Sequence, residues 1–244
     1  MERVSVKVGP YIVHLRTLIS GNKTQILLVH GLGVSGDYYI KYAEKLAPYY
    51  DVYIIDLPGY GKTPKPPKPL TILELSDVVL KYISNSEIKE CIIVGQSMGC
   101  QIVAHVIVGS PHLFSRAILL APTTNKKERG LFIQGFRLWQ DTFHEKLSVT
   151  FIVFTNYIRM GLRRFLVTSR YMIEDHIEDV LKLVKIPVLI VYGSKDKIAP
   201  REWGEFLASI TYKGAAIEMR PAPHLLHYQK PDELVKITRR FTDI

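Results

Sequence analysis

The stretch IIVGQSMGCQIVAHVIV, residues 92–108, combines the features of a buried strand, a sharp turn and a helix. Ser97 stands at the turn, with Gly95 two residues before it and Gly99 two residues after it. A strand that runs directly into a helix through G-x-S-x-G holds its central residue in a strained conformation, and the flanking residues must be small because strand and helix pass closely. We therefore expect the Ser97 hydroxyl to stand exposed above a sheet.

Short runs of Val, Ile and Leu recur on both sides of this stretch, as in strands that are covered on both faces. After an N-terminal hairpin at 4–8 and 11–18, the expected strands span residues 25–30, 52–58, 91–96, 117–122, 187–193 and 215–221. Apolar periodicity predicts helices at residues 37–47, 71–84, 98–110, 201–211 and 231–241. This alternation predicts an α/β protein with a doubly wound, mostly parallel, eight-stranded sheet.

One interval departs from this rhythm, because about sixty residues separate the sixth predicted strand from the seventh, whereas ordinary connections have about two to six. The interval, residues 123–185, is rich in aromatic and basic side chains. We interpret it as a helical lid over the carboxyl edge of the sheet, where doubly wound folds bind their ligands. The predicted core then consists of residues 1–122 and 186–244.

Composition restricts the class of protein. Of the 244 residues, 47% are hydrophobic and 23% are charged, as in an ordinary soluble globular domain. The N-terminus lacks the pattern of a signal peptide and no run approaches the roughly 18 apolar residues of a membrane span, so we expect a cytoplasmic protein. The net charge is +9, but basic and acidic residues are interleaved, which favours a solvated surface over a nucleic-acid partner.

The two cysteines, Cys91 and Cys100, are too few for a disulfide framework, and we expect both to be small buried residues. No group of Cys, His and Asp in the sequence has the spacing of metal ligands, so the prediction includes neither a metal nor another cofactor. Most histidines are expected to be structural, including His30 under the loop that follows its strand and His105 on the packing face of its helix.

A serine hydroxyl is a weak nucleophile near neutral pH unless a base accepts its proton and an acid orients that base. Both are found where predicted strands end, because Asp196 follows the strand at 187–193 and His224 follows the last strand. The chain order Ser97, Asp196, His224 is the order that accompanies this kind of turn. His227 is the competing base, and we favour His224 because it comes first after the strand.

The stretch His30-Gly31-Leu32-Gly33 directly follows another predicted strand. The backbone N–H of Leu32, together with that of Met98, is placed to hold the oxyanion of a tetrahedral intermediate. A nucleophile, a base, an acid and oxyanion donors therefore fall at strand ends in a compatible order, and this combination predicts acyl transfer.

Five stretches resemble motifs of the α/β-hydrolase family: HGLGVSGDYY, DLPGYGKT, VGQSMGC, YGSKDKIAP and PHLLHYQKPDEL. In that family they are the oxyanion loop, a structural turn, the nucleophile elbow, the acid loop and the histidine loop. The resemblance covers nearly the whole chain and implies the α/β-hydrolase fold, a helical cap at residues 123–185 and a cofactor-independent hydrolase that forms an acyl-enzyme. A serine at position 97, where dehalogenases and epoxide hydrolases of this family have aspartate, argues against their chemistry.

The predicted substrate is a carboxylic ester of short to medium acyl chain, because a lid of about sixty residues encloses a limited cavity. Aromatic side chains are the candidate substrate contacts: Tyr38, Phe136, Trp139 and Phe154, with Phe132, Phe151 and Tyr157 as further lid aromatics. Three alternatives remain open, namely a lactonase, a hydrolase of carbon–carbon bonds and a receptor-like member with little turnover. The expected partner is a small ester or lactone, and the sequence leaves the oligomeric state open.

Overall fold

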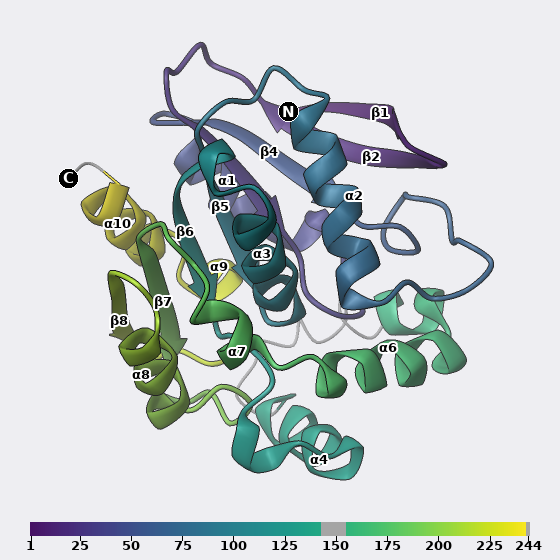
Figure 1. The fold of residues 1–244 in the computed structure, drawn as a ribbon, viewed down its shortest axis with the longest axis vertical. Coiled ribbons are helices and arrows are strands. Elements are labelled where there is room, and N and C mark those ends of the chain that lie inside the picture. The colour runs from purple at the N-terminus through teal and green to yellow at the C-terminus, as the bar shows by residue number, and fades with distance from the viewer. Residues whose placement is uncertain (143–154, 243–244) are drawn as a thin grey trace.

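The computed structural model describes residues 1–142 and 155–242, except for the side chains of residues 138, 139, 141 and 142. Its centre is an eight-stranded sheet with the order β1-β2-β4-β3-β5-β6-β7-β8 (Figure 1). The strands are β1 (Glu2–Val8), β2 (Tyr11–Leu18), β3 (Gln25–Val29), β4 (Asp51–Asp56), β5 (Cys91–Gln96), β6 (Phe114–Leu120), β7 (Val188–Gly193) and β8 (Gly214–Met219).

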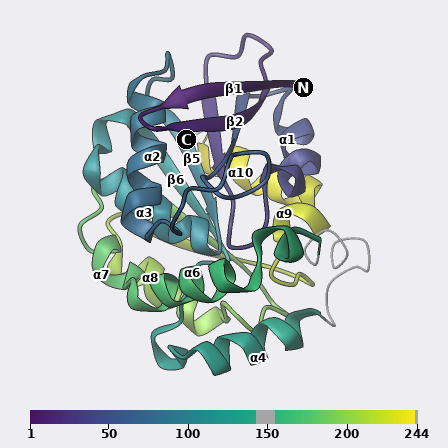
Figure 2. The ribbon, with the colours of Figure 1, turned by 90° about the vertical axis from the view of Figure 1, so that its right-hand side faces the viewer.

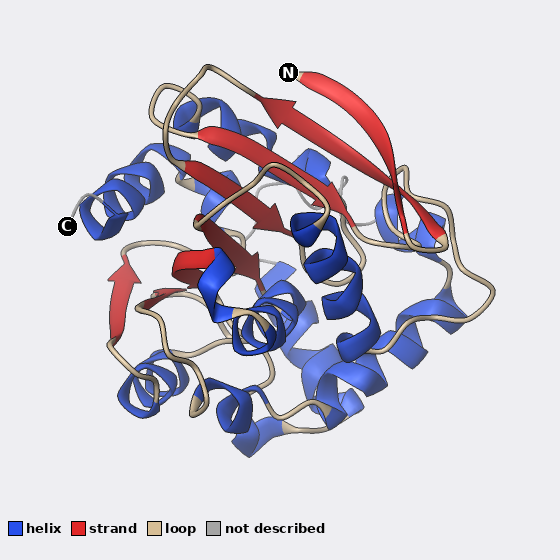
Figure 3. Ribbon diagram, turned by 45° about the horizontal axis from the view of Figure 1, so that its top comes forward, coloured by secondary structure: helices blue, strands red, loops and turns tan. Residues whose placement is uncertain are grey.

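The sheet is mostly parallel, as predicted. β2 runs antiparallel to β1 and to β4, so the N-terminal hairpin forms one edge of the sheet (Figure 3). All other neighbouring strands are parallel. The α/β class with a mostly parallel eight-stranded sheet is thus confirmed.

Helices cover both faces of this sheet (Figure 2). One face carries α2 (Ile72–Ser84), α3 (Met98–Gly109), α7 (Ile177–Leu181) and α8 (Arg201–Ile210). The other carries α1 (Ile40–Leu46), α9 (Leu226–Gln229) and α10 (Pro231–Thr242). Each helix predicted from periodicity is present, although the first begins with a 3-10 turn, η1 (Gly36–Tyr39), before α1.

The two apolar layers follow from the period of a strand, in which successive side chains point to opposite faces. In β3, Leu27 and Val29 pack with α2 and α3, whereas Ile26 and Leu28 pack with α1. All residues of β5 are buried, which explains the continuous apolar run before Ser97.

The interval between β6 and β7 is mostly helical where the structure describes it. It contains η3 (Lys126–Glu128), α4 (Leu131–Thr142), a helical segment at 155–160 and α6 (Leu162–Glu174), followed by α7. Figures 1 and 2 place α4 and α6 together at one end of the molecule. Among the described residues, no helix combines the length and the apolar character needed to cross a bilayer.

Long-range polar contacts tie this interval to the core. Nε2 of His105 on α3 lies 2.6 Å from Oδ1 of Asp175, which follows α6. Near the N-terminal end of α6, Nη2 of Arg164 donates to the carbonyl of Pro66 at 2.6 Å, in the proline-rich loop after β4. His105 thus pairs with a carboxylate at the C-terminal end of α6. The predicted place of His105 on the packing face of its helix did not indicate this contact.

Candidate active site

Ser97 occupies the turn between β5 and α3. Its φ and ψ angles are 54° and −119°, a region of backbone space that side chains other than that of glycine rarely adopt. The N–H of Ser97 donates to the carbonyl of Leu120 at 2.9 Å, which fastens the turn to β6. Ser97 is half-buried, between fully buried neighbours. The strained conformation expected from the sequence is therefore present.

The flanking glycines allow β5, α3 and β3 to approach closely. A Cβ atom on Gly95 would lie 2.4 Å from the carbonyl oxygen of Gly99. A Cβ atom on Gly99 would lie 2.4 Å from the carbonyl oxygen of Val29. Neither position has space for a side chain, so the G-x-S-x-G pattern is a packing requirement at this turn.

The loops after β7 and β8 bring Asp196 and His224 together. Nδ1 of His224 lies 2.8 Å from Oδ2 of Asp196, and both residues are buried. The other carboxylate oxygen of Asp196 accepts the N–H groups of Ile198 at 2.8 Å and Ala199 at 2.9 Å. Because an ionised carboxylate only accepts hydrogen bonds, Nδ1 of His224 carries the proton and its Nε2 is left as an acceptor.

The loop after β3 passes beside Ser97, since a Cβ atom on Gly31 would lie 3.1 Å from the Cβ of Ser97. Nε2 of His30 accepts the N–H of Leu57 at 3.0 Å, so Nδ1 carries the proton and donates to the carbonyl of Gly31 at 2.8 Å. That carbonyl shares a planar peptide with the N–H of Leu32. His30 therefore sets the direction of the N–H that we predicted as an oxyanion donor.

A buried ion pair supports the same loop. Nη1 of Arg16 lies 2.8 Å from Oδ1 of Asp56, and both side chains are fully buried. Oδ1 of Asp56 also accepts the N–H of Gly36 at 2.7 Å, and Oδ2 accepts the N–H of Lys62 at 3.0 Å. Burial alone raises the pKa of Asp56, but the hydrogen bond and the charge of Arg16 outweigh it, and the pKa is lowered. Asp56 thus holds two turns, one at Gly36 and one at Lys62.

Met98 and Cys100, which lie in the first turn of α3, complete the surroundings of Ser97. Met98 begins α3, and a helix leaves its first N–H groups without i−4 partners; here the N–H of Cys100 donates to the carbonyl of Ser97 at 2.9 Å. The Sγ atom of Cys100 lies 3.3 Å from the carbonyl oxygens of Gly95 and Leu120. Burial raises the pKa of the Cys100 thiol well above its usual value, so it stays neutral beneath the turn. Both cysteines are free and buried, as expected.

The structure locates part of the predicted substrate-contact set. Tyr38 is 1% exposed, and hydrogen bonds within the core occupy its hydroxyl, so it supports the loop after β3 from inside the protein. Phe136 on α4 is 53% exposed. The side chain of Trp139 and the whole of Phe154 lie outside the described residues.

Tyr157, an aromatic residue of the interval between β6 and β7, contacts the loop after β3. A Cβ atom on Gly33 would lie 1.9 Å from Cε1 of Tyr157, so the ring packs directly on the Gly33 backbone, whose φ is +72°. The rings of Tyr157 and Phe165 are 5.0 Å apart between centroids. One of the aromatic residues named from the sequence thus lies against the residue that follows Leu32.

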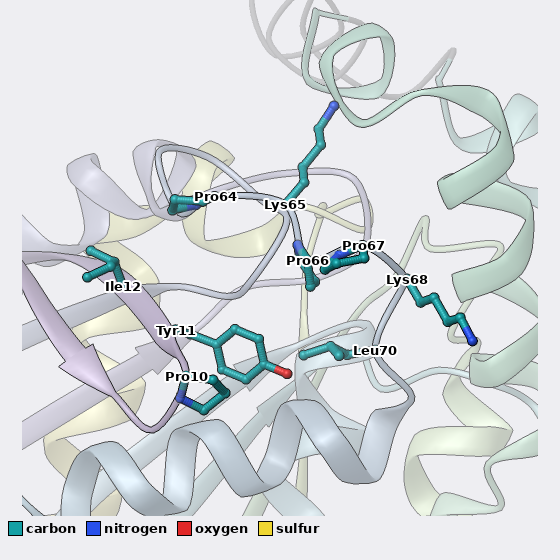
Figure 4. Close-up of a pocket in the computed structure, with 9 residues that line it drawn as sticks. All are labelled: Pro10, Tyr11, Ile12, Pro64, Lys65, Pro66, Pro67, Lys68 and Leu70. Carbon is teal, nitrogen blue, oxygen red and sulfur yellow. The ribbon is translucent and has the colours of Figure 1, made fainter.

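A separate cavity of about 580 Å³ lies between the hairpin turn and the proline-rich loop (Figure 4). Its lining comes from residues 10–12, residues 64–68 and Leu70. The residues singled out around Ser97 do not contribute to this lining, so the cavity is not part of the candidate site.

His227 is expected to make the stability of the protein dependent on pH. It is fully buried, with its ring 4.3 Å from the Tyr38 ring and 4.5 Å from the Tyr39 ring between centroids. Burial, followed by the neighbouring His224, lowers the pKa of His227 to about 3. Below a pH of about 6.5 the His227 imidazole is protonated in the unfolded chain but stays neutral in the folded chain. The free energy of unfolding is expected to fall by up to ~1.4 kcal/mol per pH unit between about 6.5 and about 3.

The variant His227→Phe tests this dependence, because it keeps an aromatic ring and removes the titrating group. Urea unfolding followed from neutral to acidic pH is expected to give a shallower loss of stability for the variant, by ~1.4 kcal/mol per pH unit. Burial also lowers the pKa of His30, so the variant keeps part of the acid sensitivity. If the free energy of unfolding changes with pH at the same slope in the parent protein and in His227→Phe, the titrating group is not His227.

Comparison with known proteins places this geometry in context. Residues 26–237 match the family model described as the Alpha/beta hydrolase family. The uncharacterized hydrolase YugF of Bacillus subtilis is 24% identical over 236 residues, which cover 85% of each chain. A pimeloyl-[acyl-carrier protein] methyl ester esterase of Vibrio campbellii is 24% identical over 206 residues, covering 74% of this chain and 79% of that protein.

Solved structures share the fold over the whole chain. The enol-lactonase of Burkholderia xenovorans superposes with a TM-score of 0.85 at 18% identity, covering 99% of this chain and 100% of the other. A thermophilic esterase of Thermogutta terrifontis superposes with a TM-score of 0.82 at 18% identity, covering 100% and 98% of the two chains.

Proposed function

Because the chain belongs to the Alpha/beta hydrolase family, we propose that it is a serine hydrolase that cleaves carboxylic esters of short to medium acyl chain. The observation that carries the proposal is the buried Asp196–His224 pair, 2.8 Å apart, on loops beside the strained turn of Ser97. A fold alone does not define a reaction, so the proposal rests on the chemistry of these side chains.

In the first half of the reaction, Nε2 of His224 accepts the hydroxyl proton of Ser97 while Oγ attacks the ester carbonyl. Asp196 keeps Nδ1 of His224 protonated and stabilises the imidazolium that forms. The backbone N–H groups of Leu32 and Met98 donate to the oxyanion. The intermediate then expels the alcohol, whose oxygen takes the proton from His224, and the acyl group remains on Ser97.

In the second half, a water molecule attacks the acyl-enzyme and His224 accepts its proton. The acid leaves, and the proton returns from His224 to Oγ of Ser97. These groups supply both the proton transfers and the stabilisation of the oxyanion, so the proposal includes neither a cofactor nor a metal.

The substrate lies, in this proposal, between the Ser97 turn and the lid. Within the predicted interval 123–185, the lid is the part before α7, because Ile177 and Leu181 of α7 are fully buried in the core beside α3. Tyr157 is the lid residue best supported as a pocket wall, since its ring packs on Gly33 next to Leu32. Phe136, Trp139 and Phe154 remain predicted contacts on the same lid.

A panel of acyl substrates tests the proposal. It contains nitrophenyl esters of increasing chain length, simple methyl esters, lactones and a peptide amide. The Vibrio campbellii relative is named for a methyl ester, which is why methyl esters are included. The expected result is a maximum of kcat/KM at a short or medium acyl chain, because the pocket under the lid is limited in length.

Other outcomes would redirect the proposal. A lactone with a higher kcat/KM than every open-chain ester would favour the lactonase alternative. A stoichiometric burst of nitrophenol with little turnover after it would favour a receptor-like protein. Activity on the amide alone, or on no acyl substrate, would defeat the proposal.

A further inference from the structure

Tyr38 and Gln96 are buried polar side chains that take no part in the proton transfers. The hydroxyl of Tyr38 accepts the N–H of Gly31 at 2.9 Å and donates to Oε1 of Gln96 at 2.8 Å. Nε2 of Gln96 lies 3.5 Å from the carbonyl oxygen of His224, a long contact. Tyr38 and Gln96 are each 1% exposed. These contacts therefore lead from the oxyanion loop to the histidine loop through the protein interior.

The direction of these hydrogen bonds is determined by chemistry. The N–H of Gly31 can only donate, so the Tyr38 oxygen accepts it and the hydroxyl proton needs an acceptor. Oε1 of Gln96 is that acceptor, and the amide therefore turns its NH2 group toward the carbonyl of His224. Rotating the amide by half a turn would leave the buried Tyr38 proton without a partner, which is costly in the protein interior.

Tyr38 acts on the peptide that carries the predicted oxyanion donor. Glycine has a freely variable backbone, so Gly31 needs outside contacts to hold one conformation. Its N–H is held by Tyr38 and its carbonyl by His30, and the carbonyl shares its peptide plane with the N–H of Leu32. A Cβ atom on Gly31 would lie 2.7 Å from Oε1 of Gln96, so the peptide also rests against that amide.

A second contact joins the same loops. His227 on α9 packs edge-on against Tyr38, with the ring planes at 90° and the centroids 4.3 Å apart. Since His227 follows His224 by three residues, the histidine loop touches Tyr38 through a side chain as well as through Gln96.

We propose that Tyr38 and Gln96 are positioning residues that hold the Leu32 oxyanion donor and the His224 loop in register around Ser97. The inference rests on the proposed esterase function and adds two residues that touch neither the substrate nor the reacting atoms. A misplacement of about 1 Å in reacting groups can cost on the order of 100-fold in rate. We call the hydrogen bonds from Gly31 through Tyr38 and Gln96 to the His224 carbonyl the bridge. Loss of the bridge therefore lowers kcat, while substrate binding in the ground state changes little.

The experiment compares Tyr38→Phe with the matched control Tyr39→Phe. Tyr39 is also fully buried, and its hydroxyl donates to the carbonyl of Val29 at 3.2 Å; it adjoins the Tyr38 hydroxyl but reaches neither Gly31 nor Gln96. We expect Tyr38→Phe to lower kcat by about 10- to 100-fold with KM changed less than ~2-fold. Tyr39→Phe is expected to stay within ~3-fold of the parent protein in kcat, with a comparable change in Tm.

A second pair of variants carries the test if Tyr38→Phe does not fold. Gln96→Met removes the other half of the bridge, and Gln101→Met is its control, because Gln101 is a buried glutamine of α3 that donates to the carbonyl of Met172. The bridge predicts a similar fall in kcat for Gln96→Met and for Tyr38→Phe. It also predicts that the double variant is no more than ~3-fold worse than either single variant, because both break the same connection.

The outcomes separate this inference from the proposed function. A parent protein without turnover on any acyl substrate would overturn the proposed function and this inference with it. A parent protein that turns over, together with equal kcat values for Tyr38→Phe and Tyr39→Phe or a change in KM alone, would overturn only the bridge. In Tyr38→Phe the low-field proton resonance of His224 Nδ1–H is expected to persist, because its bond to Asp196 does not involve Tyr38.

Discussion

Replacing Ser97 with alanine is expected to lower kcat by about 10⁴- to 10⁶-fold, because it removes the oxygen that we propose forms the acyl-enzyme. The fold is expected to remain, since alanine at the φ of 54° found for Ser97 bears the same backbone strain as serine. The predicted oxyanion donors at Leu32 and Met98 are retained in this variant, so weak residual catalysis and a nearly unchanged KM are expected. The measurement is kcat and KM on the best ester of the panel.

Labelling with a fluorophosphonate probe provides an independent check on Ser97. The probe is expected to label the parent protein once per chain and to leave Ser97→Ala unlabelled. Ser209→Ala is the matched control, because Ser209 is an exposed serine of α8 whose hydroxyl donates to the carbonyl of Phe206. Labelling that persists in Ser97→Ala would move the nucleophile to another residue.

The strands and the longer helices were predictable because each follows a local rule. The start of α2 is an example, because Thr71 and Glu74 form a capping box there. Oγ1 of Thr71 accepts the N–H of Glu74 at 3.2 Å, and Oε2 of Glu74 accepts the N–H of Thr71 at 2.7 Å. Boundaries were less certain, since β6 was expected at 117–122 and is found at Phe114–Leu120. It starts earlier because Phe114 is buried, and it ends where Ala121 has a φ of 49°.

The juxtaposition of Asp196 and His224 was predictable for a topological reason. Both follow parallel strands, β7 and β8, which are neighbours and end at the same edge of the sheet. The carbonyl of Ala222 accepts the N–H of Lys195 at 2.9 Å, which fastens the two loops together. The membership of the α/β-hydrolase family, inferred from five short stretches, is confirmed. The catalytic roles of the two residues remain predictions.

Contacts between segments that are distant in the sequence could not be predicted from local sequence patterns. Tyr38 was named as a substrate contact because it follows the oxyanion loop, but its hydroxyl binds Gln96, which is 58 positions away in the sequence. A tyrosine is apolar along its ring and polar at its tip, so its position alone does not tell which partner the hydroxyl finds. One signal was present, since Gln96 is a polar residue that ends an otherwise apolar strand beside Ser97.

The same reason explains why the interval between β6 and β7 was predicted only as helical. Its contacts with the core, such as the pair of His105 and Asp175, join residues 70 positions apart. The short helix α9 also escaped prediction, because its four residues are too few to show a helical period.

His224, and not His227, is expected to be the general base, and the two differ in ways that the structure makes measurable. Asp196 fixes the Nδ1 proton of His224, which makes Nε2 the ring nitrogen that accepts a proton, whereas the pKa of His227 is lowered to about 3. A base with so low a pKa has little tendency to take a proton from a serine hydroxyl near neutral pH.

We therefore expect His224→Gln to lower kcat by about 10⁴-fold, as the loss of a base in such a triad does. His227→Phe keeps the ring that packs on Tyr38 and is expected to retain at least about a tenth of the parent kcat, since only packing is altered. Both variants are measured on the same ester, and circular dichroism checks that each is folded. A larger loss in His227→Phe than in His224→Gln would transfer the role of base to His227, and the Asp196–His224 pair would then be a structural contact.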